Sequence, residues 1–298
     1  MNKYLMEGRL NVIQLFTDSA ANLPRDFIEK YQIEVIPLTY TVDGKEQNEL
    51  TDIFAGETYY NELRSGSVVK TSMINTEMFK RRFEEQILLG NDIIYVGMSS
   101  GISGTINASC VAADELKSKY PNSKIEIIDT LGASLGEGML VLETAKMIKL
   151  KLSIENIKKQ VKLLVPKMCQ CLTVDDLKYL RKSGRISGAA ALIGGLLGIH
   201  PLLIGNDQGK IVMYSKTRGL KGALESLADR YAKLVTDKAR EIGIAHADNL
   251  NGARYLLDCL KKRGFCGNCT TVCYEPVTGS HVGPGAVALF FFGKNRSL

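Results

Sequence analysis

Short apolar runs alternate with amphipathic segments through the first half of the chain. The apolar runs predict strands at 11–16, 34–42, 92–97 and 124–129. Between them, Pro24 suits the first position of a helix over 24–31. Phe79, Phe83 and Ile87 recur at helical spacing, and a further helix follows at 105–120. Strands that alternate with helices predict βαβ units and a mainly parallel sheet.

The second half of the chain has a different pattern. Residues 220–235 form an amphipathic helix whose apolar stripe is Leu220, Ala223, Leu224, Leu227, Tyr231 and Leu234. The segment 200–218 is typical of two strands joined by a turn at 206–209. Further strands are expected within 269–277 and 286–293. Adjacent strands with short turns favour antiparallel pairing, so this half is expected to be α+β.

The boundary between the two halves is expected near residues 151–168, at Pro166. We therefore predict an α/β protein of two domains, 1–165 and 166–298. The first domain has a mainly parallel sheet, and the second has a mixed or antiparallel sheet.

Composition and charge exclude only a few classes of function. The chain is 45% hydrophobic and 23% charged, which is ordinary for a soluble protein. Its net charge of +6 suits an anionic ligand without requiring one. No nucleic-acid-binding motif is present, so we expect no nucleic-acid partner. No apolar run is long enough to span a bilayer, and the first residues do not resemble a signal peptide. We expect a cytoplasmic protein with at most transient membrane contact.

The cysteines favour reduced thiols over disulfides or a metal site. There are 7 of them, an odd number. Cys266, Cys269 and Cys273 are close in sequence, but a structural zinc site wants four ligands, usually in two pairs. Because Cys269 and Cys273 alternate with other residues as in a strand, ordinary buried thiols are the preferred interpretation, and no metal is expected.

Polar segments stand where predicted strands end, at 17–19, 99–105 and 129–130. In an open α/β sheet, ligands bind beyond the carboxyl ends of the strands. Small hydroxyl residues and bare glycine N–H groups ahead of a helix make an anion site there. The alternative is that these residues only cap the following helices. For 99–105 binding is favoured, because this loop carries more hydroxyls than one cap needs.

The same loop also fits a catalytic motif. Gly97 to Gly101 match G-x-S-x-G, the nucleophile elbow of serine hydrolases, with Ser99 at its centre. A hydrolase needs a histidine base, and His281 follows in a Gly/Pro-rich loop. However, the segment continues past Gly101 as a longer loop than a sharp elbow. A serine hydrolase or esterase that uses Ser99 and His281 stays the alternative hypothesis.

Three further segments carry candidate chemistry. Thr71 and Ser72 are expected in a loop ahead of a helix that Asn75 or Thr76 would cap. Basic residues, among them Arg185, precede a Gly/Ala-rich run at 188–198, which is expected to be a loop or a broken helix, because glycine disfavours helices. Arg218 is expected at a strand end, where it is either a solvated residue or a partner for a carboxylate or phosphate.

These motifs together resemble the DegV family of bacterial fatty-acid-binding proteins. The resemblance covers residues 11–293 and rests on motifs that occur in one order: FTDS, KTS, SSGISGT, DT, DDLKYLRKSGRIS, KTR and HVGPGA. The chain departs from the family pattern where Met73 and Ile74 follow KTS in place of an early proline, and where His200 replaces a usual lysine.

The resemblance implies a fold and a function. The first domain would be Rossmann-like and carry the Ser/Thr loops, while the second would help to enclose an acyl chain. The protein would bind a long-chain fatty acid such as palmitate in an apolar tunnel, as the non-catalytic subunit of a kinase system. A separate ATP-dependent fatty acid kinase would then phosphorylate the carboxylate for phospholipid synthesis or lipid transport. No cofactor besides the bound fatty acid is implied.

The resemblance also implies site residues. The expected carboxylate-binding set is Thr71, Ser72, Ser99, Ser100, Gly101, Arg218 and His281. Within that set, Thr71 and Ser100 match the hydroxyls that hold the carboxylate. Arg185, Arg218 and His281 are the residues expected to act in hand-over to the kinase.

Overall fold

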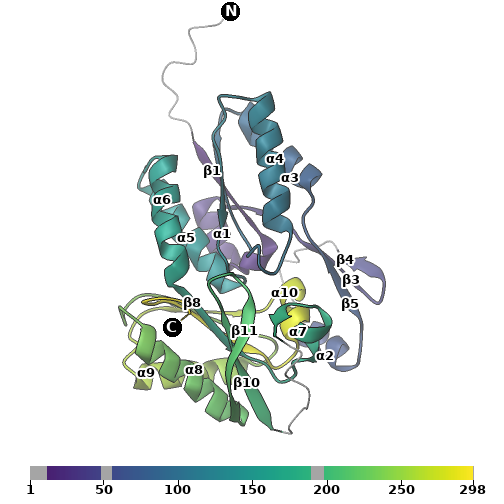
Figure 1. Ribbon diagram of the computed structural model, residues 1–298, viewed down its shortest axis with the longest axis vertical. Coiled ribbons are helices and arrows are strands. Elements are labelled where there is room, and N and C mark those ends of the chain that lie inside the picture. Colours follow the sequence, from purple (N-terminus) through teal and green to yellow (C-terminus); the bar gives the residue numbers. More distant parts are fainter. Residues whose placement is uncertain (1–11, 48–55, 189–197, 298) are drawn as a thin grey trace, which may run out of the picture.

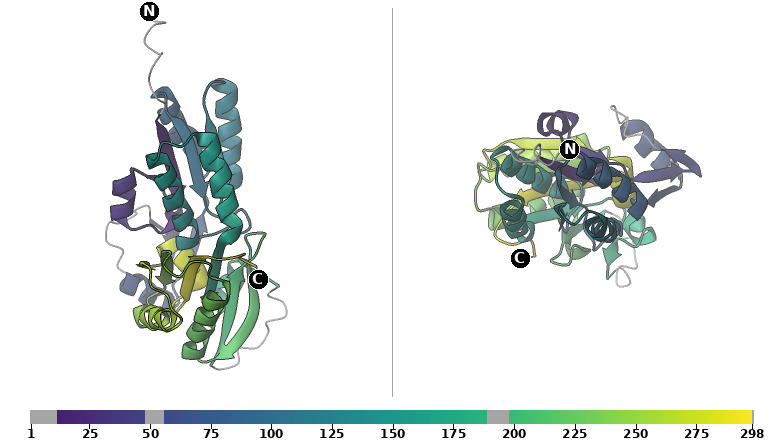
Figure 2. Two further views of the ribbon diagram at one scale, coloured as in Figure 1. Left: turned by 90° about the vertical axis from the view of Figure 1, so that its left-hand side faces the viewer. Right: turned by 90° about the horizontal axis from the view of Figure 1, so that it is seen from above.

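The computed structural model describes residues 12–47, 56–188 and 198–297 of the chain (Figure 1). Figure 2 shows two halves stacked along the longest axis, each built around its own sheet. The upper half contains a parallel sheet of 4 strands in the order β2-β1-β6-β7. These strands are β1 (Ile13–Asp18), β2 (Glu34–Ile36), β6 (Asp92–Gly97) and β7 (Ile125–Asp129).

Helices cover both faces of this parallel sheet. Every residue of β6 is buried, which explains its continuous apolar run. The helices α3 (Thr76–Leu88) and α4 (Thr105–Lys119) cover one face, and α5 (Leu135–Lys149) and α6 (Ile154–Leu164) cover the other. The shorter helices η1 (Ser19–Ala21) and α1 (Arg25–Tyr31) follow β1, whereas α2 (Gly56–Arg64) lies in the lower half, where Tyr60 donates to the Tyr274 carbonyl. Pro24 lies in extended conformation one residue before α1, so its expected place inside the helix was wrong by one position.

The lower half is built on a mixed sheet of 7 strands in the order β13-β12-β14-β8-β10-β11-β9. Its strands are β8 (Met168–Thr173), β9 (Ile186–Ser187), β10 (Ile199–Gly205), β11 (Ile211–Arg218), β12 (Ile242–His246), β13 (Cys269–Cys273) and β14 (Val287–Phe292). The predicted hairpin at 200–218 is confirmed as β10 and β11. The helices α8 (Leu220–Leu234) and α9 (Leu250–Lys262) cover the outer face of the mixed sheet.

A third sheet was not expected. The antiparallel strands β3 (Thr39–Val42), β4 (Lys45–Gln47) and β5 (Val69–Ser72) pair in the order β4-β3-β5. The predicted single strand at 34–42 is therefore wrong, because the chain leaves the parallel sheet after Ile36 and enters another sheet at Thr39. Proline at position 37 has no N–H for a sheet hydrogen bond, which favours this break.

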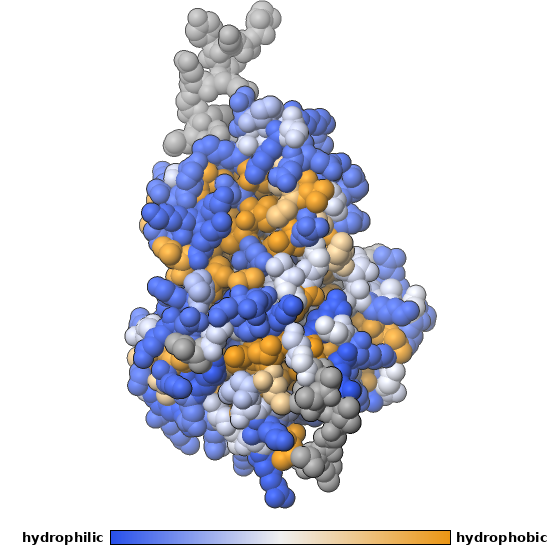
Figure 3. Space-filling view, in the orientation of Figure 1, coloured by the Kyte–Doolittle hydropathy of each residue, from blue (hydrophilic) through white to orange (hydrophobic). Residues whose placement is uncertain are grey.

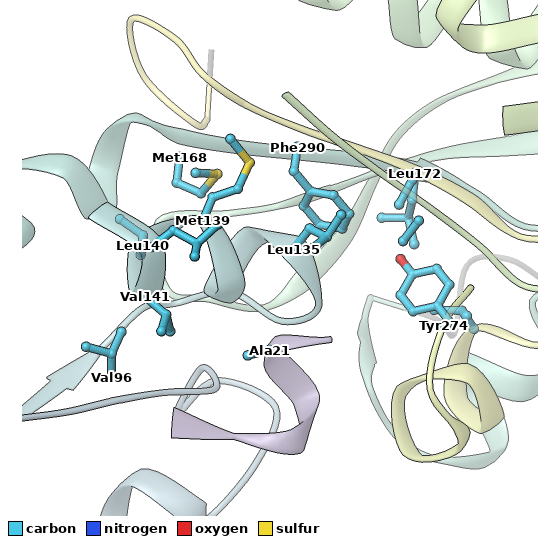
Figure 4. Packing of buried hydrophobic residues seen from close by; sticks show 14 of the residues in the cluster. Ala21, Val96, Leu135, Met139, Leu140, Val141, Met168, Leu172, Tyr274 and Phe290 are labelled. Atoms are coloured by element: carbon cyan, nitrogen blue, oxygen red, sulfur yellow. The ribbon is translucent and has the colours of Figure 1, made fainter. Parts of the chain in front are cut away.

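The two halves share one hydrophobic core at their junction. Figure 4 shows α5 crossing this junction, with Leu135, Met139 and Leu140 among its buried side chains. On one side α5 meets the parallel sheet at Val96, and on the other it meets Phe290 of the mixed sheet. The remaining short elements of the lower half are η2 (Val165–Lys167), α7 (Lys178–Lys182) and α10 (Pro276–Val282). The helix α10 also contacts β3, so the last part of the chain packs against the third sheet.

The mixed α/β fold with a parallel sheet and a mixed sheet is the one that the sequence predicts. The boundary at 165/166 stays a prediction; it falls within η2, just before β8, the first strand of the mixed sheet. Most of the Gly/Ala-rich run at 188–198 lies outside the described residues, so the structure does not test its conformation. Among the residues that the structure describes, no helix has the length and apolar character that would cross a membrane.

Candidate functional site

A cavity of about 320 Å³ lies where the carboxyl ends of the parallel strands meet the mixed sheet. This volume is within the range of ~300–1,000 Å³ that small-molecule sites occupy. Its floor is the sheet face formed by Leu172, Ala288 and Phe290, together with Gln170. Its roof comes from the loops that follow β6 and β7, and α10 closes one side. The lining is mainly apolar, with one polar region besides the separate polar side chains of Ser134, Gln170, Tyr274 and Thr278.

That polar region, here called the polar cluster, consists of Thr71, Ser72, Ser103, Arg185 and His281. The Thr71 Oγ1 and His281 Nε2 atoms are 3.1 Å apart and form a hydrogen bond. Thr71 and Ser72 were expected in a loop, but they are the last residues of β5, paired with Tyr40 and Thr39. A strand position holds these side chains more firmly than a free loop would.

Arg185 and His281 set the electrostatics of the polar cluster. Arg185 is the only cation that lines the cavity within the described part of the chain. Its Nε donates to the Ile102 carbonyl at 3.2 Å, and a terminal nitrogen donates to the Ser183 carbonyl. Burial, with the nearby positive charge of Arg185, lowers the pKa of His281 to about 4. The imidazole is therefore neutral at neutral pH, and the cluster offers hydrogen bonds together with one fixed positive charge.

Ser99, the serine at the centre of the elbow motif, has a structural role. Its side chain is fully buried, and its Oγ donates to the carbonyl of Gly209 at 2.8 Å. The same oxygen accepts the N–H of Gly101 at 3.0 Å. His281, the expected base, is bonded to Thr71 instead. The geometry therefore gives the serine hydrolase alternative no support, because Ser99 holds the β10–β11 turn and does not line the cavity.

Other expected ligand residues also lie off the cavity wall. Ser100 is exposed, and its backbone N–H faces the Asp129 carboxylate at 3.3 Å. Gly101 packs against the backbone of Gln208 in the β10–β11 turn, where a side chain would clash. Arg218 is exposed at the end of β11, opposite Ile199. The structure thus brings Thr71, Ser72, Arg185 and His281 together, but not Ser99, Ser100, Gly101 or Arg218. For the β6–α4 loop, the reason is that its first residues turn toward the β10–β11 hairpin, while Ser103 faces the cavity.

The cavity wall between β7 and α5 is tightly held. In this loop Leu131 has a φ of 51° and Ser134 a φ of 53°, which are unfavourable values for residues with side chains. The buried Arg296 donates to the Leu131 carbonyl at 2.8 Å. Gln170 bonds both the Leu131 carbonyl and the Ala133 N–H, each at 3.3 Å. These hydrogen bonds hold the loop backbone in its strained conformation and fix the shape of the cavity wall.

Buried carboxyl groups surround the apolar core beside the cavity. Burial raises the pKa of Asp18, which accepts the Tyr95 hydroxyl at 2.6 Å. Burial raises the pKa of Glu137 well above its usual range, and the Asp18 charge adds to the shift. Glu275 caps α10, and burial raises its pKa to about 7. Burial therefore disfavours the charged form of all three acids.

Sequence reasoning missed several residues of the cavity. Tyr274, Thr278 and Gln170 all line it, yet none belongs to a predicted site motif. Gln170 had a readable signal, because it is a polar residue in the middle of the apolar strand β8. Tyr274 and Thr278 lie just before His281, so a search around that histidine would have reached them. Their orientation toward the cavity depends on α10 and was not readable from the sequence.

The cysteine-rich segment differs from the expected buried thiols, because Cys266 is exposed and Cys269 and Cys273 are only partly buried. Cys269 and Cys273 are the end residues of β13, as the strand pattern predicts, and all the cysteines are free. Over the described ranges, no group of three or more His, Cys, Asp or Glu side chains is arranged to hold a metal ion.

Comparisons with known proteins agree with this architecture. The model of a family described as an uncharacterised protein, DegV family, matches residues 12–294. A DegV domain-containing protein of Clostridium perfringens is 37% identical, with 95% of this chain and 98% of the relative covered. A fatty-acid-binding DegV family protein of Streptococcus agalactiae has a solved structure with a TM-score of 0.85 and 28% identity, which covers 96% of this chain and 100% of that one.

A third relative leads to the same family. The structure of a DegV family protein from Thermus thermophilus, described by its fatty acid binding, has a TM-score of 0.84 at 25% identity. The match covers 94% of this chain and 99% of that protein. Because the family model spans nearly the whole chain and the solved relatives share its fold from end to end, this protein belongs to the DegV family.

Proposed function

We propose that this protein binds a long-chain fatty acid such as palmitate, with the acyl chain in the cavity and the carboxylate at the polar cluster. One observation carries the proposal: a mainly apolar cavity ends in a hydrogen-bonding group, Thr71 with His281, beside the cation Arg185. A fatty acid has the same division between a long apolar tail and one anionic end. The relatives from Streptococcus agalactiae and Thermus thermophilus, described as fatty-acid-binding, support the same ligand class.

The energetics favour such a ligand. Burying ~14 methylenes at ~0.8 kcal/mol each releases about 11 kcal/mol before the costs of association. A buried carboxylate without donors would cancel much of this gain. Thr71 and Arg185 supply those donors, and the neutral His281 orients the Thr71 hydroxyl. Among the described residues Arg185 forms no salt bridge, so the carboxylate of the ligand does not have to displace one of their acidic side chains.

We further propose that the protein is a binding subunit without catalytic activity of its own and without a cofactor. It would present the carboxylate to a separate ATP-dependent kinase, whose acyl phosphate product enters phospholipid synthesis. Ser72 and Met73 support this role, because both line the cavity and are exposed at the surface, so the polar cluster lies close to solvent. On the face of the molecule seen in Figure 3, apolar side chains gather just below the middle, among hydrophilic ones.

Native mass spectrometry of the purified protein tests the binding proposal. We expect one acyl chain of roughly sixteen carbons per protein, a length at which methylene burial exceeds the association costs. The Thr71→Val variant should retain much less lipid after the same purification. Absence of stoichiometric lipid, together with no binding of added fatty acid, would show that the cavity serves another ligand.

A further inference from the structure

Tyr274 places an unpaired hydroxyl on the wall of the cavity. Its side chain is only 4% exposed to solvent and lines the cavity beside Leu172. Figure 4 shows the hydroxyl oxygen directed toward Leu172 and away from the backbone of its own strand end. Among the described residues, none forms a hydrogen bond with this hydroxyl. A buried phenol normally has a partner, so this one is open for a group inside the cavity.

Gln170 adds a second polar group to the same floor. It is two residues before Leu172 on the same face of β8, roughly 7 Å away along the strand. A side-chain amide has two N–H donors and two acceptor lone pairs. Within the part of the chain that the structure describes, Gln170 uses one donor on Leu131 and one acceptor on Ala133. One N–H and one lone pair remain beside the cavity.

A plain alkyl chain does not satisfy these groups. If a saturated fatty acid filled the cavity, it would remove water from the Tyr274 hydroxyl and the Gln170 amide and give no hydrogen bond in return. The Tyr274 hydroxyl keeps its proton at neutral pH, because burial and the Glu275 charge raise its pKa further. It can therefore both donate to and accept from a neutral oxygen, which is the pattern that an alcohol offers.

We propose that the cavity is built for a fatty acid that carries a hydroxyl group along its chain, and that Tyr274 is the residue that recognises this hydroxyl. Gln170 is the second partner on the cavity floor. The inference rests on the proposed fatty acid function and specifies the ligand class. It predicts a preference that a merely apolar tunnel cannot show, because such a tunnel penalises every added hydroxyl through lost hydration.

The test compares three ligands on the delipidated wild-type protein by titration calorimetry: stearate, stearate hydroxylated near mid-chain, and stearate hydroxylated at its last carbon. We expect the mid-chain alcohol to bind at least as tightly as stearate, and the terminal alcohol to bind at least tenfold more weakly. Tyr274→Phe should weaken the mid-chain alcohol by about tenfold and strengthen stearate by about threefold, because the unpaired hydroxyl is gone. Tyr214→Phe is the matched control, since Tyr214 lies on β11 outside the cavity and should change neither affinity.

The possible outcomes separate the inference from the proposed function. If the wild type binds stearate more tightly than the mid-chain alcohol, a trapped water satisfies Tyr274 and the inference fails, while fatty acid binding stands. Equal weakening of stearate and the mid-chain alcohol in Tyr274→Phe would assign Tyr274 to the carboxylate, which also overturns the inference. If none of the three ligands binds, the proposed function itself fails. The wild-type comparison decides the matter even if Tyr274→Phe does not fold.

Discussion

Thr71 and His281 are separated by 210 residues in sequence, yet their Oγ1 and Nε2 atoms are 3.1 Å apart. The contact joins β5 of the small antiparallel sheet to α10, which enters the junction from the lower half. Because the pKa of His281 is lowered to about 4, the imidazole is neutral and the contact is a neutral hydrogen bond. With its proton on Nε2, His281 donates to the Thr71 oxygen and leaves the Thr71 hydroxyl proton free for an incoming carboxylate, while Arg185 supplies the charge.

Removing the Thr71 hydroxyl should weaken fatty acid binding. Hydrogen bonds to charged groups contribute about 1.5–3 kcal/mol, so Thr71→Val should raise the Kd for palmitate at least tenfold. Thr71→Ser keeps the hydroxyl and should stay within about threefold of the wild type. Fluorescent fatty acid displacement measures all three proteins. Equal affinity of Thr71→Val and wild type would place the carboxylate elsewhere.

The buried Ser99 should be inert as a nucleophile and important for stability. A fluorophosphonate probe should leave it unlabelled, because its hydroxyl is committed to the Gly209 carbonyl. Ser99→Ala leaves that carbonyl without this donor and should lower the free energy of unfolding by about 1–3 kcal/mol in urea titrations. Ser103→Ala, in the same loop but facing the cavity, is the matched control and should cost less. Stoichiometric labelling of Ser99 would restore the hydrolase hypothesis.

The Glu275 carboxyl should make the fold less stable as the pH rises. Burial raises its pKa from 4.5 to about 7, so between these values the folded state holds a proton that the unfolded chain has released. Its contribution to stability is therefore lost as the pH rises through this window. Glu275→Gln stays neutral, so its free energy of unfolding relative to wild type should increase by about 2–3 kcal/mol from about pH 5 to 8.

Chemical denaturation of both proteins across this pH range gives the measurement. His281 contributes in the opposite direction in wild type and variant alike, because its pKa is lowered and its contribution is lost as the pH falls below its ordinary value of 6.5. Taking the difference between the two proteins cancels that effect. A difference that is constant with pH would show that Glu275 is ionised throughout.

Arg218 should matter for hand-over and not for binding. It is exposed at the end of β11 and does not line the cavity, so Arg218→Ala should change palmitate affinity by less than about twofold. Acyl phosphate formation with a cognate kinase should fall at least fivefold, because a partner that carries phosphate groups can use the forked guanidinium. Both quantities are measured on the same preparation. Equal losses would make Arg218 a ligand residue, and no loss in either would make it a solvated surface charge.

The order of the secondary structure was largely readable from the sequence. The apolar run of β6, the amphipathic stripe of α8 and the turn between β10 and β11 are local patterns, and each was predicted within a few residues. Local patterns succeed here because burial imposes a period on each element by itself. The resemblance to the DegV family, carried by short motifs, predicted the location of Thr71 and His281 in one site.

Which residues belong to the site was decided by the tertiary structure. The hydroxyls of the β6–α4 loop look equivalent in the sequence, yet the β10–β11 turn takes Ser99 as a structural partner and Ser103 faces the cavity. Likewise, nothing local to Tyr274 predicts an unpaired hydroxyl, because its direction follows from the way α10 packs between the two halves. Hydrophobic patterning determines which face of an element is buried. Contacts between segments far apart in sequence decide which polar groups then meet inside and which lack a partner, as for Thr71 and His281, which are 210 residues apart.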